Sequence, residues 1–286
     1  MDSSVGRIAV VTGASRGIGK ATALALADAG FDLALAARTV RRGDEHADMV
    51  RNPDGSSLPG SLEETRDAVV AKGRRARLQR LDLLEAETIE TLVEDTLSEW
   101  GRIDVLVNNA IYQGPGLMAD FLDGSMEDLG KVFQANVIAQ VHLTRLALRP
   151  MLEQGEGIIV NLTSEAGMTD PPLKLATGGW SYAHGATKAA LHRMAGILHL
   201  EYAERGIRAY NLEPGLVRSE SLIASMGEST QLEKMGVKSA PVEVPAAVIR
   251  WLCTAADAIA LSGQNIHAQP FCKKNQLLPG WPGSSR

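Results

Sequence analysis

The glycines Gly13, Gly17 and Gly19 lie between an apolar run at 7–12 and an apolar-faced stretch at 17–29 that predicts a helix. Because glycine has no Cβ, the backbone of such a turn can approach a pyrophosphate closely. The N-terminus of the helix that follows offers unpaired N–H groups to the phosphates. A strand, a glycine-rich turn and a helix in this order are typical of a dinucleotide-binding site. We therefore expect a dinucleotide to be bound by Gly13, Ser15, Arg16, Gly17, Ile18 and Gly19.

Arg38 ends the second apolar run, at 31–38, after two alanines. In proteins that bind NAD, an acidic residue usually stands near the end of this strand and hydrogen-bonds the ribose 2′-hydroxyl. Here the run ends without a carboxylate that would repel a 2′-phosphate, and Arg38 and Arg16 are both placed to pair with that phosphate bidentately. We therefore expect NADP(H) to be favoured over NAD(H).

Two further predicted strands end in candidate cofactor residues. Asp82 and Leu83 follow the third apolar run, where an adenine ring would be held. Asn109 and Ala110 end the fourth apolar run. We expect all four residues to contribute to the cofactor site.

Strands and helices alternate along the chain. Apolar runs predict strands at 7–12, 31–38, 76–82, 103–110, 157–164, 207–215 and 263–268. The stretches between them predict helices at 17–29, 61–72, 85–100, near 125–153 and at 184–205. Strict alternation, with strands apolar on both faces, requires a parallel sheet covered by helices on each side. The predicted fold is α/β, a Rossmann-type doubly wound parallel sheet in a single domain, with cofactor and substrate sites within 1–270 and a C-terminal extension at 271–286.

Three segments interrupt this alternation and show no strong pattern of their own: 41–60, 169–180 and the tail from Phe271. Loops of this length in a compact domain are usually either functional or disordered. The segment 169–180 follows a strand with a candidate catalytic residue, so we interpret it as a substrate lid. By contrast, Ser61 with Glu64 forms a capping box that begins a helix.

The composition of the chain argues against some classes of binding partner. The chain has 286 residues, 45% of them hydrophobic, and a net charge of −5, so it lacks a global positive field for nucleic acid or an anionic membrane. We expect a soluble, cytoplasmic protein with a small-molecule substrate, since the N-terminus has no hydrophobic signal core. Cys253 and Cys272 have no metal-ligand spacing and are expected to be structural thiols, so no metal is predicted. Packing or surface roles are expected for His46, His142, His192, His199 and His267.

Several motifs occur together in one order: TGASRGIG at 12–19, LDLL at 81–84, NNA at 108–110, Asn136 in QANVIAQ, Ser164 in VNLTSEAG, GATKAAL at 185–191 and PGLVRS at 214–219. In this order the chain resembles the short-chain dehydrogenase/reductase family, over roughly residues 5–270. The resemblance implies a nicotinamide cofactor, a homo-tetramer or homo-dimer, and an active site of Asn, Ser, Tyr and Lys. The stretch at 56–65 further resembles a hydroxysteroid dehydrogenase-like subgroup.

The resemblance assigns a role to most of these residues. Asn136 would support a proton relay, Ser164 would bind the substrate oxygen, and Lys188 would hold the ribose and lower the pKa of a catalytic tyrosine. The nicotinamide pocket would be bounded by Pro214, Gly215, Val217 and Ser219, the last in place of a threonine. The catalytic tyrosine that the resemblance implies, four residues before the lysine, is absent from its expected position. That position is His184, and Tyr182 is six residues before Lys188.

The spacing to Lys188 distinguishes His184 from Tyr182. At about 100° per residue, residues four apart share a helix face, whereas residues six apart point about 120° away from each other. His184 therefore faces where Lys188 faces. If the helix is already regular at residue 182, the Tyr182 phenol packs elsewhere, and if it begins at residue 184, the phenol can swing into the site. Both arrangements remain open.

A histidine at position 184 changes the expected proton chemistry. The usual histidine pKa is about 6.5, and the neighbouring Lys188 cation would lower it. A neutral imidazole accepts a proton from an alcohol but is a poor acid for reducing a carbonyl, so a bias toward oxidation is expected.

Three functions follow. The first is an NADP(H)-dependent oxidoreductase that interconverts a secondary alcohol and a ketone, with His184 or Tyr182 exchanging the proton. The second is a cofactor-binding sensor or scaffold without redox turnover. The third is a lyase or hydratase derived from the same fold.

Overall fold

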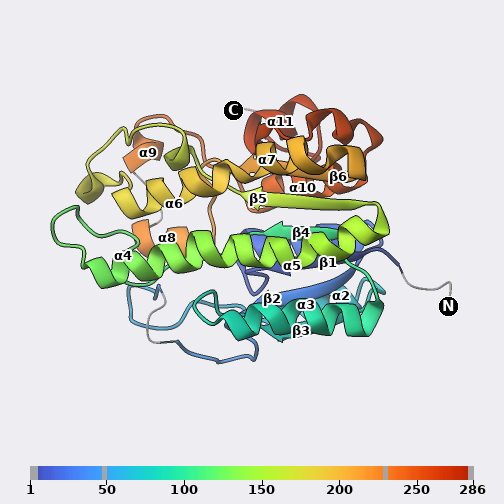
Figure 1. Cartoon of the computed structure of the whole chain (residues 1–286). Helices are drawn as coiled ribbons and strands as arrows, with labels where there is room; N and C mark the ends of the chain where they lie inside the picture. Colours follow the sequence, from blue (N-terminus) through green and yellow to red (C-terminus); the bar gives the residue numbers. More distant parts are fainter. Residues whose placement is uncertain (1–5, 47–49, 228–230, 283–286) are drawn as a thin grey trace.

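Seven parallel strands form one sheet in the order β3-β2-β1-β4-β5-β6-β7 (Figure 1). The computed structural model describes residues 6–46, 50–227 and 231–282. The strands are β1 (Ile8–Thr12), β2 (Asp32–Ala37), β3 (Ala76–Arg80), β4 (Val105–Asn108), β5 (Gly157–Leu162), β6 (Ile207–Glu213) and β7 (Asn265–His267). The strand order reverses between β1 and β4, which is where ligands bind in folds of this kind. The Rossmann-type doubly wound fold predicted from the sequence is confirmed.

The central strands are apolar on both faces because both faces are covered. In β1, Ala9 and Val11 belong to one buried core, while Ile8 and Val10 belong to the other. Successive strand residues point to opposite sides of a sheet, so each core takes every second residue. This explains why the runs that predicted strands are continuous rather than alternating.

Helices cover the sheet in two layers (Figure 1). The first core is closed by α1 (Gly17–Asp28), α2 (Leu62–Val70), α10 (Glu243–Thr254) and α11 (Ala268–Lys274). The second core is closed by α3 (Ala86–Trp100), α4 (Met126–Phe133), α5 (Ala139–Gln154), α6 (Tyr182–His192) and α7 (Met194–Tyr202). Two short helices, α8 (Glu220–Met226) and α9 (Gln231–Lys234), follow β6. Within the described ranges, none of the helices combines the length and apolarity needed to span a bilayer.

The helix ends agree with the local signals. Ser61 precedes α2, and its hydroxyl accepts a hydrogen bond from the Glu64 N–H at 3.2 Å. Gly101 ends α3 in the left-handed conformation, at φ 71°. Both cysteines are buried and unpaired in the first core, consistent with structural thiols.

Two long predicted helices are interrupted. The stretch near 125–153 contains α4, a π-helical turn at Gln134–Ile138 and α5, and the stretch at 184–205 is divided into α6 and α7. Hydrophobic periodicity does not detect these interruptions, because the same side of the chain still faces the core on each side of them. The tail from Phe271 also differs from the prediction, since Phe271 lies inside α11 and the side chains of Leu277 and Trp281 pack against the first core.

Four asparagines form a hydrogen-bonded ladder across the carboxyl half of the sheet. Asn108, Asn161, Asn211 and Asn265 occupy matching register positions on β4, β5, β6 and β7. Their side-chain amides bond in series, with N···O distances of 2.9, 3.2 and 2.8 Å. The first three are fully buried, so the ladder ties together the strands that lead to the cleft described below.

Removing one asparagine of the ladder leaves buried amide groups of its neighbours without a hydrogen-bond partner, which destabilises the fold. We expect Asn161→Ala to lower the free energy of unfolding by about 3 kcal/mol, because it leaves the Asn108 and Asn211 amides short of a partner. Urea unfolding followed by circular dichroism measures this change. The exposed Asn275→Ala is the control, with an expected change within about 0.5 kcal/mol. Equal losses in both variants would contradict a role for the ladder.

Candidate active site

A cleft of about 1720 Å³ opens where the strands end at their carboxyl edge. Its wall includes Gly13 after β1, Arg38 after β2, Asn109 after β4 and Ser164 after β5. The cleft is lined by every candidate residue from the sequence except Gly19, Asn136 and Tyr182. One cavity therefore brings together the predicted cofactor residues and most of the predicted catalytic residues.

The glycine-rich turn has the backbone that a phosphate cradle requires. Gly13 and Gly17 have φ of 67° and 55°, a region that favours glycine. A Cβ on Gly19 would stand 2.1 Å from the Gly13 carbonyl oxygen, so Gly19 packs inside the turn rather than facing the cleft. No side chain caps α1, and its first turn holds no acidic residue, so its N-terminus is suited to an anion. The turn thus fits a dinucleotide's pyrophosphate.

Thr12 fastens this turn to the end of β4. Its hydroxyl donates to the Val107 carbonyl at 3.1 Å and accepts hydrogen bonds from the N–H groups of Asn109 and Ala110, both at 3.0 Å. The Asn109 side chain in turn donates to the Thr12 carbonyl at 2.8 Å. These bonds fix the distance between the two strands on either side of the point where the strand order reverses.

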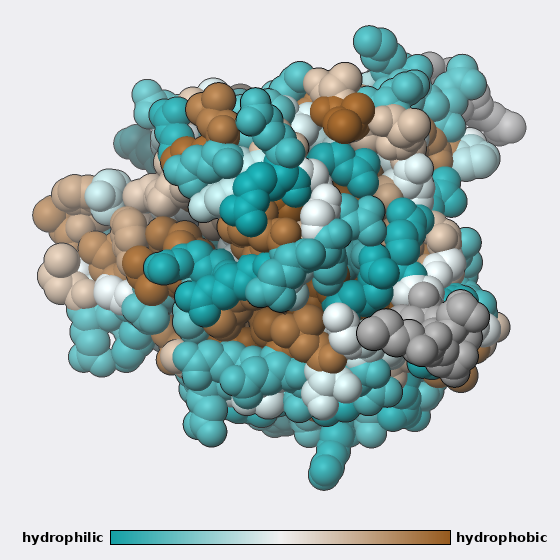
Figure 2. Space-filling model, turned by 45° about the vertical axis from the view of Figure 1, so that its right-hand side comes forward, coloured by the Kyte–Doolittle hydropathy of each residue, from teal (hydrophilic) through white to brown (hydrophobic). Residues whose placement is uncertain are grey.

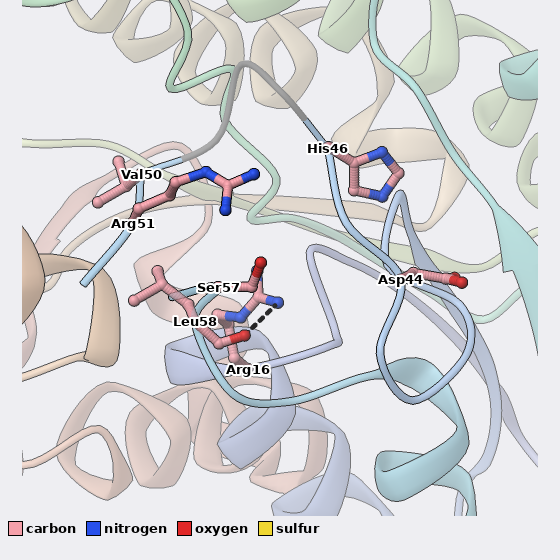
Figure 3. A pocket seen from close by; sticks show the side chains of 7 residues that line it. All are labelled: Arg16, Asp44, His46, Val50, Arg51, Ser57 and Leu58. Atoms are coloured by element: carbon pink, nitrogen blue, oxygen red, sulfur yellow. Dashed lines mark hydrogen bonds between the residues drawn. The ribbon is translucent and has the colours of Figure 1, made fainter. Parts of the chain in front are cut away.

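Arg16 has a role that the sequence did not indicate. Its guanidinium donates to the carbonyl oxygens of Pro59 and Gly60 at 2.8 and 3.0 Å, and to that of Leu58 at 3.5 Å (Figure 3). Arg16 therefore holds the end of the 41–60 segment against the glycine-rich turn, and Val50 and Leu58 become part of the cleft wall. These carbonyls occupy much of the guanidinium that was expected to bind a 2′-phosphate, which leaves Arg38 as the principal candidate.

His184 lines the cleft from the first turn of α6. Burial, and after it the charge of Lys188, lowers the pKa of this imidazole to about 4. His184 is therefore neutral at pH 7, as the sequence predicts, although burial contributes more than the neighbouring cation. Its buried Nδ1 has no hydrogen-bond partner among the described residues. The side chain lines the cavity as a neutral imidazole, in which one ring nitrogen can accept a hydrogen bond.

Lys188 lies one turn after His184 on the same helix. Its Nζ donates to the Leu162 carbonyl at 2.6 Å, and burial lowers its pKa to about 8. The bond joins α6 to the end of β5, two residues before Ser164. Close backbone packing nearby requires Gly167, where a Cβ would stand 2.6 Å from the Lys188 carbonyl carbon.

Ser164 and Asn136 differ in their access to the cleft. Ser164 lines it, and its hydroxyl accepts a hydrogen bond from the Ala166 N–H at 3.2 Å, which leaves the hydroxyl hydrogen for donation. Asn136 is buried in the π-helical turn, where its Oδ1 accepts a hydrogen bond from the Tyr112 N–H at 2.7 Å. Asn136 therefore positions the backbone of a cleft residue without lining the cleft.

Tyr182 lies outside the cavity. The helix is regular from residue 182, with Ser181 as its N-cap, which is the arrangement in which the phenol was expected to pack elsewhere. Tyr182 is 57% exposed, and its ring meets that of Phe121 edge-to-face with the ring centroids 5.7 Å apart. This placement argues against Tyr182 as the proton-transfer residue.

Several cleft residues were not anticipated from the sequence. Tyr112 and Trp180 line the cleft, as does Glu213, whose carboxylate accepts a hydrogen bond from the Gly215 N–H at 2.6 Å and faces His267 at 3.3 Å. Glu213 thereby shapes the turn that carries Pro214 and Gly215. The position of Tyr112 two residues after the NNA motif is the one available sequence signal for it. The segment 169–180, predicted to be a lid, contributes much of the remaining wall.

Comparison with known protein families agrees with the fold of the chain and with the position of the cleft. A model described as short chain dehydrogenase matches residues 7–59 and 56–228, which is most of the chain. The chain belongs to the short-chain dehydrogenase family. This membership favours the oxidoreductase prediction over the sensor and lyase alternatives, and members of the family use NAD(H) or NADP(H).

Relatives of this short-chain dehydrogenase share most of its length. It is 31% identical to a 3-oxoacyl-[acyl-carrier-protein] reductase of a Synechocystis strain, over 93% of this chain and 97% of that protein. It is also 31% identical to an uncharacterized oxidoreductase of Mycobacterium tuberculosis, over 85% of this chain and 84% of that one. The crystal structure of a short-chain type dehydrogenase/reductase from Mycobacterium marinum superposes with a TM-score of 0.74 at 25% identity, covering 91% and 93% of the two chains.

The buried imidazole makes the fold sensitive to acid. The His184 pKa is about 4 in the folded chain and 6.5 for the free side chain, so the unfolded chain binds the proton first as the pH falls. Stability present above pH 6.5 is therefore lost as the pH falls toward 4. We expect His184 to account for about 3 kcal/mol of the loss in unfolding free energy between pH 7 and pH 4.

Denaturant unfolding across this pH range, in wild type and His184→Gln, measures the contribution. The variant has no titrating group at the position, so its unfolding free energy should fall less steeply with acid. An identical pH dependence in the two proteins would show that the folded chain does not hold His184 neutral.

Proposed function

We propose that this short-chain dehydrogenase interconverts a secondary alcohol and a ketone with NADP(H), and that His184 exchanges the proton with the substrate oxygen. The observation that carries the proposal is an imidazole, neutral at pH 7, that lines the cofactor cleft one helical turn from Lys188. A nicotinamide bound in the cleft would accept or donate the hydride.

His184, Ser164 and Lys188 each have a different role in the proposed reaction. In oxidation, the neutral His184 accepts the proton of the alcohol while the carbon loses hydride, and the ketone is released. Ser164 would hold the substrate oxygen through its hydroxyl hydrogen. Lys188 disfavours a lasting imidazolium, because two cations one helical turn apart repel each other, so the proton passes on to solvent. Because burial and the Lys188 charge keep the imidazolium scarce at neutral pH, His184 seldom has a proton to donate to a carbonyl, which favours oxidation over reduction.

Preference for NADP(H) rests on Arg38. It lines the cleft just after β2, a position where binders of NAD usually carry a carboxylate. A guanidinium there can bind a 2′-phosphate through charge-assisted hydrogen bonds. Arg16, largely engaged by carbonyl oxygens, contributes charge more than hydrogen bonds.

A homo-dimer or homo-tetramer in the cytoplasm, acting on a small molecule, completes the proposal. Large apolar side chains on two helices are exposed in the single chain: Val141 on α5, and Ile197 and Leu200 on α7. Leu200 is 86% exposed, and assembly with further copies would cover such residues.

Turnover by variants of the two candidate residues tests the proton-transfer assignment. We expect His184→Ala to lower kcat for alcohol oxidation by about a hundredfold or more, since general base catalysis typically contributes that much. NADP(H) binding, measured by nucleotide fluorescence, should be unchanged, because the glycine-rich turn is intact. Tyr182→Phe should keep wild-type activity, because the phenol lies outside the cleft.

Two results would overturn this assignment. One is full activity in His184→Ala with loss in Tyr182→Phe or Tyr112→Phe, which would transfer the role to a phenol. The other is cofactor binding without turnover in wild type but with turnover in His184→Tyr, which would favour a cofactor-binding protein that has lost redox activity.

Replacement of Arg38 tests the cofactor preference. We expect Arg38→Ala to weaken NADP(H) binding about tenfold or more and to leave NAD(H) binding nearly unchanged, because only the former carries the 2′-phosphate. Arg42→Ala, an exposed arginine paired with Asp67, is the matched control. Tighter binding of NAD(H) than NADP(H) by wild type would contradict the proposal.

A further inference from the structure

The part of the cleft next to His184 has one wall fixed by a single hydroxyl. Ser181 accepts a hydrogen bond from the His184 N–H at 3.0 Å, and its hydroxyl donates to the Leu117 carbonyl. These two bonds place the segment around Leu117 beside the N-terminus of α6, which carries His184. Leu117 is buried, and it lines the cleft together with the more exposed Met118.

The opposite wall comes from the 169–180 segment. Trp180 lies against Gly185, where a Cβ would stand 3.6 Å from the indole Cδ1. Leu173 and Leu175 line the same cleft. The segment is folded tightly on itself, since a Cβ on Gly179 would stand 2.0 Å from the Leu173 carbonyl oxygen. An indole and aliphatic side chains thus face the space next to the proton acceptor.

The charges around this end of the cleft are mostly negative. Glu165 and Asp170 line the cleft and are exposed; in the described part of the chain, Lys234 and the buried Lys188 also line the cleft, and Lys174 is an exposed cation of the 169–180 segment. The neighbouring loop that carries Met118 also holds the exposed acids Asp120 and Asp123. A polyanionic substrate would therefore meet like charge at the entrance.

We infer, on the basis of the proposed function, that the substrate is an uncharged secondary alcohol bearing a mid-sized apolar ring or branched alkyl group, and that Trp180 and Leu117 select it. The cleft, at about 1720 Å³, exceeds the roughly 300–1,000 Å³ of a single-ligand pocket, so it is large enough for a dinucleotide and a second molecule together. Apolar walls stabilise a ring or alkyl group by excluding water from both surfaces.

The same walls disfavour two other classes of secondary alcohol. A sugar would bury several hydroxyl groups against Trp180 and Leu117, and hydroxyls without partners are costly to desolvate. A 3-hydroxyacyl thioester on a phosphorylated carrier would bring its negative charge past Glu165 and Asp170. The structure therefore predicts discrimination among alcohols that share one reaction.

Oxidation of four probes with NADP⁺ tests the inference: 4-tert-butylcyclohexanol, 2-propanol, glucose and 3-hydroxybutyryl-CoA. We expect the highest kcat/KM for the first, at least about a hundredfold above glucose and the thioester. Trp180→Ala should raise KM for 4-tert-butylcyclohexanol about tenfold and KM for 2-propanol much less, because the lost apolar contact affects mainly the bulky group. Trp180→Phe, which keeps an aromatic wall, should restore most of the affinity.

Phe121→Ala is the control, since its ring packs on Tyr182 outside the cleft and its loss should change neither constant. Leu117→Ala provides a second test if Trp180→Ala folds poorly, with the same expected rise in KM. Higher kcat/KM for glucose or the thioester, or an unchanged KM in both wall variants, would overturn the inference and leave the proposed oxidoreductase standing.

Absence of turnover on every probe would instead count against the proposed function. Binding then decides the substrate class by itself, with 4-tert-butylcyclohexanone added to the protein with and without NADP⁺ and followed by ligand-observed NMR. Binding that is lost in Trp180→Ala supports the apolar site, and no binding to wild type overturns it.

Discussion

Two basic side chains lie on one face of α6, His184 partly buried and Lys188 buried, and burial is the main cause of the shift in both pKa values. Burial lowers the His184 pKa to about 4 and the Lys188 pKa to about 8, and the Lys188 cation adds to the effect on His184. In the part of the chain that the structure describes, no carboxylate pairs with these two bases, so withdrawing them from water is costly and the surrounding fold must stabilise them. This cost is the physical reason why the imidazole that lines the cleft is neutral at pH 7.

The sheet supplies the rigidity on which that arrangement depends. Lys188 is anchored to the carbonyl that ends β5, and β5 is joined to its neighbours through the Asn161 amide. The Thr12 hydroxyl joins the start of the glycine-rich turn to the end of β4 through hydrogen bonds. The residues that would hold a cofactor and those that would move a proton are therefore carried by strands whose relative positions are fixed by buried hydrogen bonds.

Local patterns predicted the elements well because each depends on neighbouring residues. The strands, the Ser61 cap and the glycine-rich turn follow from apolar runs and short spacings, and all seven strands formed with ends a few residues shorter. The engagement of Arg16 by carbonyls 42 to 44 residues away has no such pattern. The position of the Tyr182 phenol could be predicted only in part. Helix geometry gave two alternatives, inside the site or packed elsewhere, and the start of α6 at residue 182 decided for the second.

The pH dependence of kcat/KM for alcohol oxidation tests most directly whether His184 is the proton acceptor. With a pKa near 4, His184 is already neutral at pH 5.5, so the rate should be nearly constant from there to pH 8. A phenol acceptor with a pKa above this range would instead give a rate that rises about tenfold per pH unit. Such a rise, retained in His184→Gln, would contradict the account.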